Sequence, residues 1–165
     1  MMKLLGSGLI FLGGALFHRI EREEVRREMD TLWNLAGALT EAAEEIRTDR
    51  MALPRVLERA SRDRTPPVAA FLRKTADAAR RGQSVQAVWN AEAETLALGR
   101  EDLAVMERAG RALSGDEDQV TRGLLQGAEA LLRSLEERRS RRPDRERRAA
   151  ALSFSGAALL VILLI

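Results

Sequence analysis

The chain of 165 residues contains no cysteine, no tyrosine and a single histidine, His18. The absence of cysteine excludes disulfides, thiolate metal sites and catalytic thiols. A single histidine supplies too few ligands for a typical zinc site and argues against a histidine-dependent nucleophile–base pair. No glycine-rich stretch has the spacing of a phosphate-binding loop. We therefore predict no catalytic residues, no cofactor and no metal, and hence a protein that is not an enzyme.

Clustered carboxylates are the remaining candidates for chemistry. General acid–base catalysis needs two carboxylates that converge in a cleft. Here the clusters fall on polar helix faces or at helix starts, where solvation and capping account for them. Residues 116–118 also lack the ligand spacing of a calcium-binding loop and its bidentate glutamate. We predict structural roles for Glu44/Glu45, Glu92/Glu94, Glu101/Asp102 and Asp116/Glu117/Asp118.

Aromatic residues are sparse, and the middle of the chain carries only Trp33, Phe71 and Trp89, which we expect among apolar neighbours. The sequence pI of about 9.8 reflects one local cluster. Residues 138–148 hold seven arginines and two acids, whereas residues 19–137 hold 19 basic and 23 acidic residues, a net charge of −4. A nucleic-acid groove needs basic residues along a whole face, with aromatics for stacking. We therefore expect no nucleic-acid partner.

Charge is absent from both ends of the chain, at residues 4–17 and 149–165. At about 1.5 Å per residue these helices would cover roughly 21 and 26 Å of a hydrocarbon core about 30 Å thick. Modest bilayer thinning would close the difference. A signal peptide is the alternative for the first stretch. We predict an N-terminal transmembrane anchor at 1–18, a cytoplasmic helical bundle at 19–142, and a basic juxtamembrane segment with a C-terminal transmembrane anchor at 143–165.

The charges beside the two anchors predict their orientation. Four arginines between residues 19 and 27 follow the first anchor, against Lys3 alone before it. The positive-inside rule therefore places the middle of the chain in the cytoplasm and both termini outside. Anionic lipid headgroups attract arginines near the membrane surface. The candidate membrane-surface contacts are Arg138, Arg139, Arg141, Arg142, Arg145, Arg147 and Arg148.

Alanine, leucine, glutamate and arginine dominate the middle of the chain, and no stretch alternates as a strand does. Pro54, Thr65, Ser84 and Asp116 are typical of helix starts, and Gly82 of a helix end. Short loops favour antiparallel neighbours, so we predict an all-α, compact antiparallel six-helix bundle. We expect helices to begin near residues 19, 54, 66, 85, 101 and 117, and Pro143 to bend or break the chain.

The first predicted helix carries a heptad seam whose apolar positions step by four and three residues. Packing inside the bundle is our first interpretation of this seam, and self-association of two chains is the second. The seam consists of Val25, Met29, Leu32, Ala36, Leu39, Ala43 and Ile46.

Short motifs along nearly the whole chain follow the pattern of one family. They are residues 2–6 (MKLLG), Glu45-Ile46, Leu53-Pro54, residues 56–59 (VLER), Val88-Trp89, Leu98, Asp102, Met106, Gly110, Leu113, Asp116, Gln119 and residues 159–165 (LLVILLI). Together they resemble the stage III sporulation protein AB family of endospore-forming bacteria. That family resembles a single cytoplasmic F-type domain of the inner-membrane platform proteins of type II secretion and type IV pili.

The chain departs from this family pattern at several positions. Thr48 stands where tyrosine is usual, Ala52 where proline is usual, and Ala109 where phenylalanine is usual. The arginine-rich segment (residues 138–148) replaces a milder basic and aromatic approach to the second anchor. Any lipid or partner contact of this segment therefore does not follow from the resemblance.

The resemblance implies a place in the channel complex between mother cell and forespore. The chain would lie in the outer forespore membrane, with its soluble domain in the mother-cell cytoplasm. The implied partners are a secretion-type hexameric ATPase, ring-forming or pilin-like membrane components, and membrane lipids. The protein would be an assembly platform that hydrolyses nothing. The alternative is a membrane-tethered helical adaptor, unrelated to sporulation, that recruits a protein partner or anionic lipid.

Overall fold

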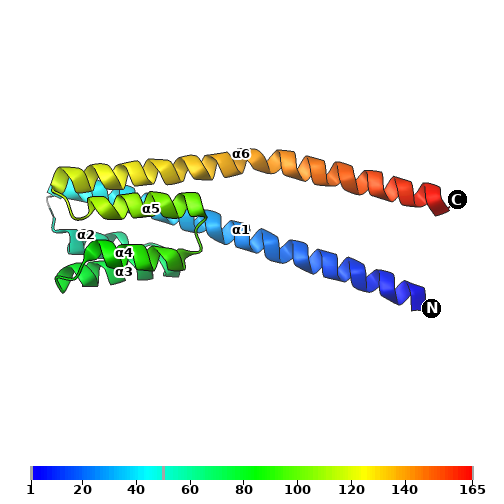
Figure 1. Cartoon of the computed structure of the whole chain (residues 1–165), viewed down its shortest axis with the longest axis horizontal. Helices are drawn as coiled ribbons and strands as arrows, with labels where there is room; N and C mark the ends of the chain where they lie inside the picture. Colours follow the sequence, from blue (N-terminus) through cyan, green and yellow to red (C-terminus); the bar gives the residue numbers. More distant parts are fainter. Residues whose placement is uncertain (1, 50, 165) are drawn as a thin grey trace. The chain divides into compact units, whose positions relative to one another are not determined.

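The computed structural model describes the backbone of residues 2–49 and 51–164, and the side chains of residues 23, 25–49 and 51–140. The described residues form helices and no strands, which confirms the all-α prediction with six α-helices (Figure 1). They are α1 (Met2–Asp49), α2 (Leu53–Ala60), α3 (Pro66–Arg80), α4 (Val85–Ala93), α5 (Arg100–Ala112) and α6 (Glu117–Leu164), with a 3-10 turn, η1 (Glu94–Leu96), after α4.

The chain divides into two compact units, residues 1–132 and 133–165. The first contains α1 to α5 and the first turns of α6, and the second is the remainder of α6. We predicted a bend or a break at Pro143, and the break does not occur, because helix α6 continues through this residue.

The two predicted anchors fall on side chains outside those that the structure describes. Among the described residues, no helix is long and apolar enough to cross a membrane. The anchors, and the domain boundaries drawn from them, stay predictions.

Local side-chain chemistry sets several helix boundaries. Proline occupies the first turns of α2 and α3, where its missing N–H costs no helical hydrogen bond. The Ser84 hydroxyl accepts a hydrogen bond from the Ala87 N–H at 3.3 Å, and the Asp116 carboxylate accepts one from the Gln119 N–H at 2.8 Å. Gly82, with φ of 66°, follows α3 in the left-handed region. These boundaries confirm the predicted caps.

Thr65 precedes α3 as predicted, but its side chain makes no capping hydrogen bond. Its N–H instead donates to the Asn34 Oδ1 of α1 at 3.3 Å, and its hydroxyl is buried without a protein partner. Pro66 and Pro67 leave the first two positions of α3 without an N–H to cap, and the Thr65 backbone instead contacts α1.

The heptad seam of α1 is buried over its last five positions, which confirms bundle packing for that part. Val25 is 42% exposed and Met29 is half-buried. Trp33 is 57% exposed, so the prediction that all three central aromatics lie among apolar neighbours is wrong for this one. At 100° per residue, Trp33 lies off the buried stripe that contains Leu32 and Leu35. The buried seam residues are Leu32, Ala36, Leu39, Ala43 and Ile46.

The other two aromatics form the centre of the core. The rings of Phe71 and Trp89 meet edge to face, with centroids 4.6 Å apart. Gly110 lies against the indole, because a Cβ at this position would be 2.5 Å from Trp89 Cδ1. One aromatic cluster thus joins α3, α4 and α5.

Ion pairs hold α2 and the turn after it against α1. Arg59 pairs with Glu45 at 3.1 Å, and Arg64 pairs with Glu41 at 2.6 Å. Gly37 leaves room for the Arg64 guanidinium, whose Nη1 would lie 2.7 Å from a Cβ at that position. The sequence gives no hint of these pairings, since the partners are 14 and 23 residues apart.

Candidate interaction surface

Small residues bring α5 and α6 into close contact. A Cβ at Gly123 of α6 would overlap the Cβ of Ala112 on α5. A Cβ at Gly127 would lie 3.3 Å from both the Ala109 Cβ and the Leu39 Cδ1. The glycines of α6 therefore permit a close helix–helix approach, and beside this contact they leave an open trough.

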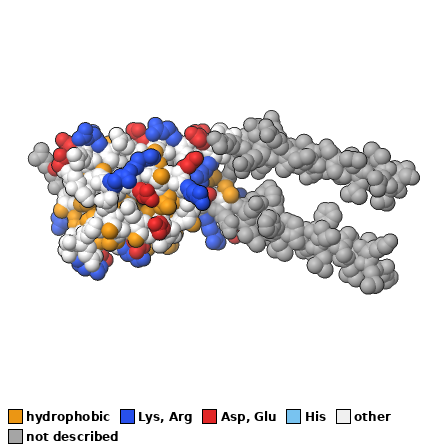
Figure 2. All heavy atoms as spheres, in the orientation of Figure 1, with side chains coloured by type: hydrophobic (Ala, Val, Ile, Leu, Met, Phe, Trp, Pro, Cys, Tyr) orange, Lys and Arg blue, Asp and Glu red, His pale blue; other side chains and the backbone are white. Residues whose placement is uncertain are grey.

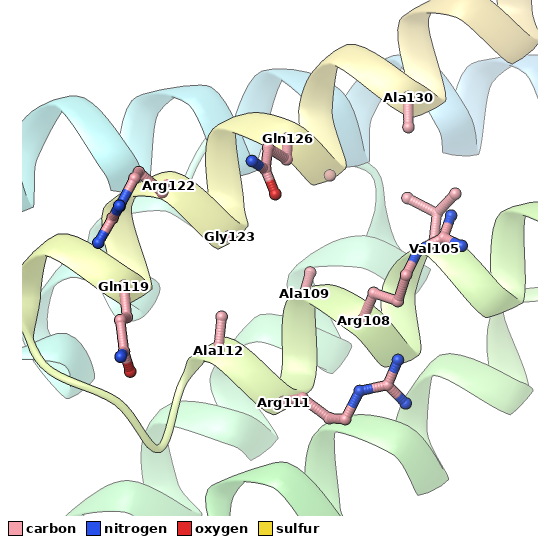
Figure 3. Close-up of a pocket in the computed structure, with 11 residues that line it drawn as sticks. Val105, Arg108, Ala109, Arg111, Ala112, Gln119, Arg122, Gly123, Gln126 and Ala130 are labelled. Carbon is pink, nitrogen blue, oxygen red and sulfur yellow. The ribbon is translucent and has the colours of Figure 1, made fainter.

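The trough, here called the α5–α6 groove, has a volume of about 540 Å³. In Figure 3, Ala109 and Ala112 extend from α5 toward α6, and their small side chains form part of its floor. The polar lining residues are all exposed. The groove is lined by Val105, Arg108, Ala109, Arg111 and Ala112 of α5, and by Gln119, Arg122, Gly123, Gln126, Gly127 and Ala130 of α6.

Positive charge dominates the α5–α6 groove, whose lining contains three arginines and no acid. None of the three forms an ion pair with a described side chain. The Arg122 Nε donates a hydrogen bond to the Asp118 carbonyl of its own helix at 3.1 Å. Figure 2 shows basic side chains on the face of α5 and α6, with acidic ones around them. The groove can therefore attract a negatively charged partner.

The sequence did not predict this groove, because it depends on how α5 pairs with α6. The available signal was the spacing of small residues at Ala109 and Ala112, and at Gly123 and Gly127, three and four residues apart. Such spacing places them on one helix face. Ala109 and Gly127 also contribute to packing, since a Cβ at Gly127 would lie 3.3 Å from the Ala109 Cβ.

The predicted lipid contacts fall on α6. Arg139 is exposed, and Arg138 is half-buried and engaged with a neighbouring group. The side chains of Arg141, Arg142, Arg145, Arg147 and Arg148 lie outside those described, and their contact with lipid stays a prediction.

Several of the carboxylates singled out from the sequence have structural roles. Glu45 pairs with Arg59, and Glu92 pairs with Lys74 at 2.7 Å. Asp102 is buried in the first turn of α5, where the helix dipole stabilises a negative charge. Among the described residues, no group of three or more potential ligands could hold a metal ion. His18 lies outside the described side chains.

A model of the family described as "Stage III sporulation protein AB (spore_III_AB)" matches residues 3–165. The chain belongs to the stage III sporulation protein AB family. No curated protein matches it.

A solved structure of a stage III sporulation protein AB (SpoIIIAB) has the same fold. The TM-score is 0.63 at 15% sequence identity, and the match covers 71% of this chain and 97% of the other. At that identity the likeness concerns the fold alone. In this member of the family, three motif positions have a clear packing role, since Trp89, Met106 and Gly110 meet in the core.

Proposed function

We propose that this protein is a non-enzymatic membrane platform in endospore formation. It would couple a cytoplasmic ATPase to ring-forming or pilin-like components of the channel between mother cell and forespore. The observation that carries the proposal is the family match over residues 3–165, which includes both apolar ends as well as the bundle. A role in sporulation follows from the family, whereas the platform role and the ATPase are our inference.

The two long helices suggest how such a platform would work. Helix α1 runs for 48 residues from the first apolar end into the bundle, and α6 runs for 48 residues into the second. At about 1.5 Å per residue α1 would be about 72 Å long. A helix without a break transmits a push or rotation better than a jointed chain. The bundle would receive conformational work from the ATPase, and α1 and α6 would pass it to membrane components.

The proposed location is the outer forespore membrane. Arginines follow the first apolar stretch and precede the second, which supports a soluble domain in the mother-cell cytoplasm and termini on the outer side. The absence of cysteine offers a clean test. Gln83→Cys, in an exposed turn, should react with a membrane-impermeant maleimide only after the cells are permeabilised. Met2→Cys should react in intact, non-sporulating cells that express the chain in their cell membrane, and the opposite pattern would refute this orientation.

Deletion of the gene tests the role itself. The mutant should complete engulfment and then fail to form spores, and the full-length chain supplied in trans should restore them. The hexameric ATPase should co-purify with the full-length chain from sporulating cells and not from cells expressing a tagged unrelated membrane protein. A deletion strain that sporulates normally would refute the role, whereas loss of co-purification alone would refute only the ATPase as a direct partner.

A further inference from the structure

We infer that the α5–α6 groove binds an acidic helix of a partner protein. The inference rests on the proposed function, since a platform without chemistry of its own acts by contacting other proteins. Two properties of the groove carry it, namely a floor of small residues and rims of arginine.

The floor of the groove suits a helix better than a small molecule. Pockets for small molecules are mostly lined by large apolar and aromatic side chains. This groove has no aromatic lining residue, and Val105 is its largest apolar one. The axes of packed helices lie about 8–10 Å apart. The distance is near the lower end of that range where the side chains between the helices are small. Ala109, Ala112, Gly123 and Ala130 leave room for a third helix to approach in this way.

The rims define the charge of that helix. Arg108 and Arg111 stand on α5 and Arg122 on α6, so cations line both sides of the floor. Each guanidinium can donate two parallel hydrogen bonds to one carboxylate. Several arginines elsewhere on the bundle, among them Arg59 and Arg64, have acidic partners. The groove arginines have no such partner among the described side chains.

The amides of Gln119 and Gln126 add neutral donors and acceptors on the α6 side. The partner helix would therefore carry alanine or glycine toward the floor and aspartate or glutamate along both edges. An anionic membrane offers similar charge, but it is a broad surface and would not need a trough with a floor of small residues.

Charge reversal in the full-length chain tests this surface. Arg108→Glu with Arg122→Glu changes the groove by four charges. The matched control, Arg55→Glu with Arg62→Glu, makes the same change at exposed arginines of α2 and the turn after it, which form no ion pair with a described side chain. Because opposed like charges replace attraction, the groove variant should lower spore counts about tenfold or more, at unchanged protein level, and the control should not. Equal effects of the two variants, or no effect of either, would overturn the inference.

Filling the groove gives a test that does not depend on charge. Ala130→Phe places a large ring in the groove at a half-buried position, and Ala70→Phe makes the same change at an exposed position of α3. Only the first should reduce spore counts. If both variants sporulate as well as the original chain, no helix occupies the groove.

A photo-reactive amino acid at Gln126 identifies the occupant in sporulating cells. Mapping of the cross-linked peptide should give an acidic helix, and the adduct should be lost with Arg108→Glu and Arg122→Glu. Cross-links to lipid, to a basic segment, or to nothing would overturn the inference. These failures differ from failure of the proposed function: a deletion strain that forms spores refutes the function, whereas a deletion defect with fully active groove variants refutes only the groove.

Discussion

The indole Nε1 of Trp89 donates a hydrogen bond to the main-chain carbonyl of Met106, 2.7 Å away. Both side chains are completely buried, and a buried polar group without a partner would be costly. This bond fixes α4 against α5, and the edge-to-face contact between Phe71 and Trp89 fixes α4 against α3. The position therefore controls how three helices of the bundle meet.

Gly110→Ala should destabilise the bundle by about 1–3 kcal/mol, the usual cost of overpacking a core. The added Cβ would lie 2.5 Å from Trp89 Cδ1, and the indole is fully buried and held by its hydrogen bond to Met106. Thermal unfolding of the full-length chain, followed by tryptophan fluorescence, measures the change. Gly37→Ala is the control, because its Cβ meets only the flexible end of Arg64 and should cost much less. Equal losses would show that the indole does not constrain Gly110.

Gly123→Ala should also destabilise the bundle by about 1–3 kcal/mol, because its Cβ overlaps that of Ala112. Ala112→Gly alone should cost about 1 kcal/mol through helix propensity. The double variant moves the methyl group from α5 to α6, and its remaining contacts with α5 would be 3.7 Å or longer. We therefore expect the double variant to lose less stability than the sum of the losses in the two single variants. Strict additivity in a double-mutant cycle would contradict the close α5–α6 contact.

Ala97→Gly should stabilise the protein slightly. Ala97 follows η1 with φ of 51°, in the left-handed region, where a Cβ costs about 1–2 kcal/mol. Glycine removes that strain, but it also raises the conformational entropy of the unfolded chain, which lowers the stability by about 0.4–1 kcal/mol. We expect a net gain of about 0.5 kcal/mol and a small rise in melting temperature. Ala91→Gly, exposed within α4, is the control and should lower stability by about 1 kcal/mol.

Local chemistry makes most helix boundaries predictable from the sequence, whereas the pairing between helices is not predictable from it. Pro54, Ser84 and Gly82 act through their own backbone and nearest neighbours, so the sequence alone places the boundaries they mark. Trp33 lies off the buried stripe of α1, so the helical period itself places this tryptophan away from the core, against the expectation drawn from its apolar neighbours. The α5–α6 groove, by contrast, depends on which faces of two helices meet.

Tryptophan fluorescence tests the unexpected exposure of Trp33, since Trp89 is the chain's other tryptophan. Trp33 is 57% exposed and Trp89 is fully buried. The Trp33→Phe variant should therefore emit at short wavelength and resist quenching by acrylamide. The Trp89→Phe variant, if still folded by circular dichroism, should emit at longer wavelength and be quenched readily. Equal protection of the two indoles would show that another surface covers Trp33 in solution.

We expect the arginine-rich segment to bind an anionic membrane surface. Each arginine near an anionic leaflet contributes about 1 kcal/mol of attraction, and salt screens this attraction. In a chain of residues 19–148, without the two apolar ends, Arg139→Glu, Arg142→Glu and Arg145→Glu together should abolish sedimentation with phosphatidylserine vesicles at low salt. Neutral vesicles should bind neither protein.

The matched control reverses three arginines on the bundle, Arg55, Arg62 and Arg73, and changes the net charge equally. Loss of binding in the triple variant of the arginine-rich segment alone would place the lipid contact there, because net charge is the same in both proteins. Loss in both would mean that overall charge governs the attraction. If neither variant loses vesicle binding, these arginines do not bind lipid, since a lipid contact of three arginines cannot survive their reversal to glutamate. They would then serve membrane topology or contact a protein partner.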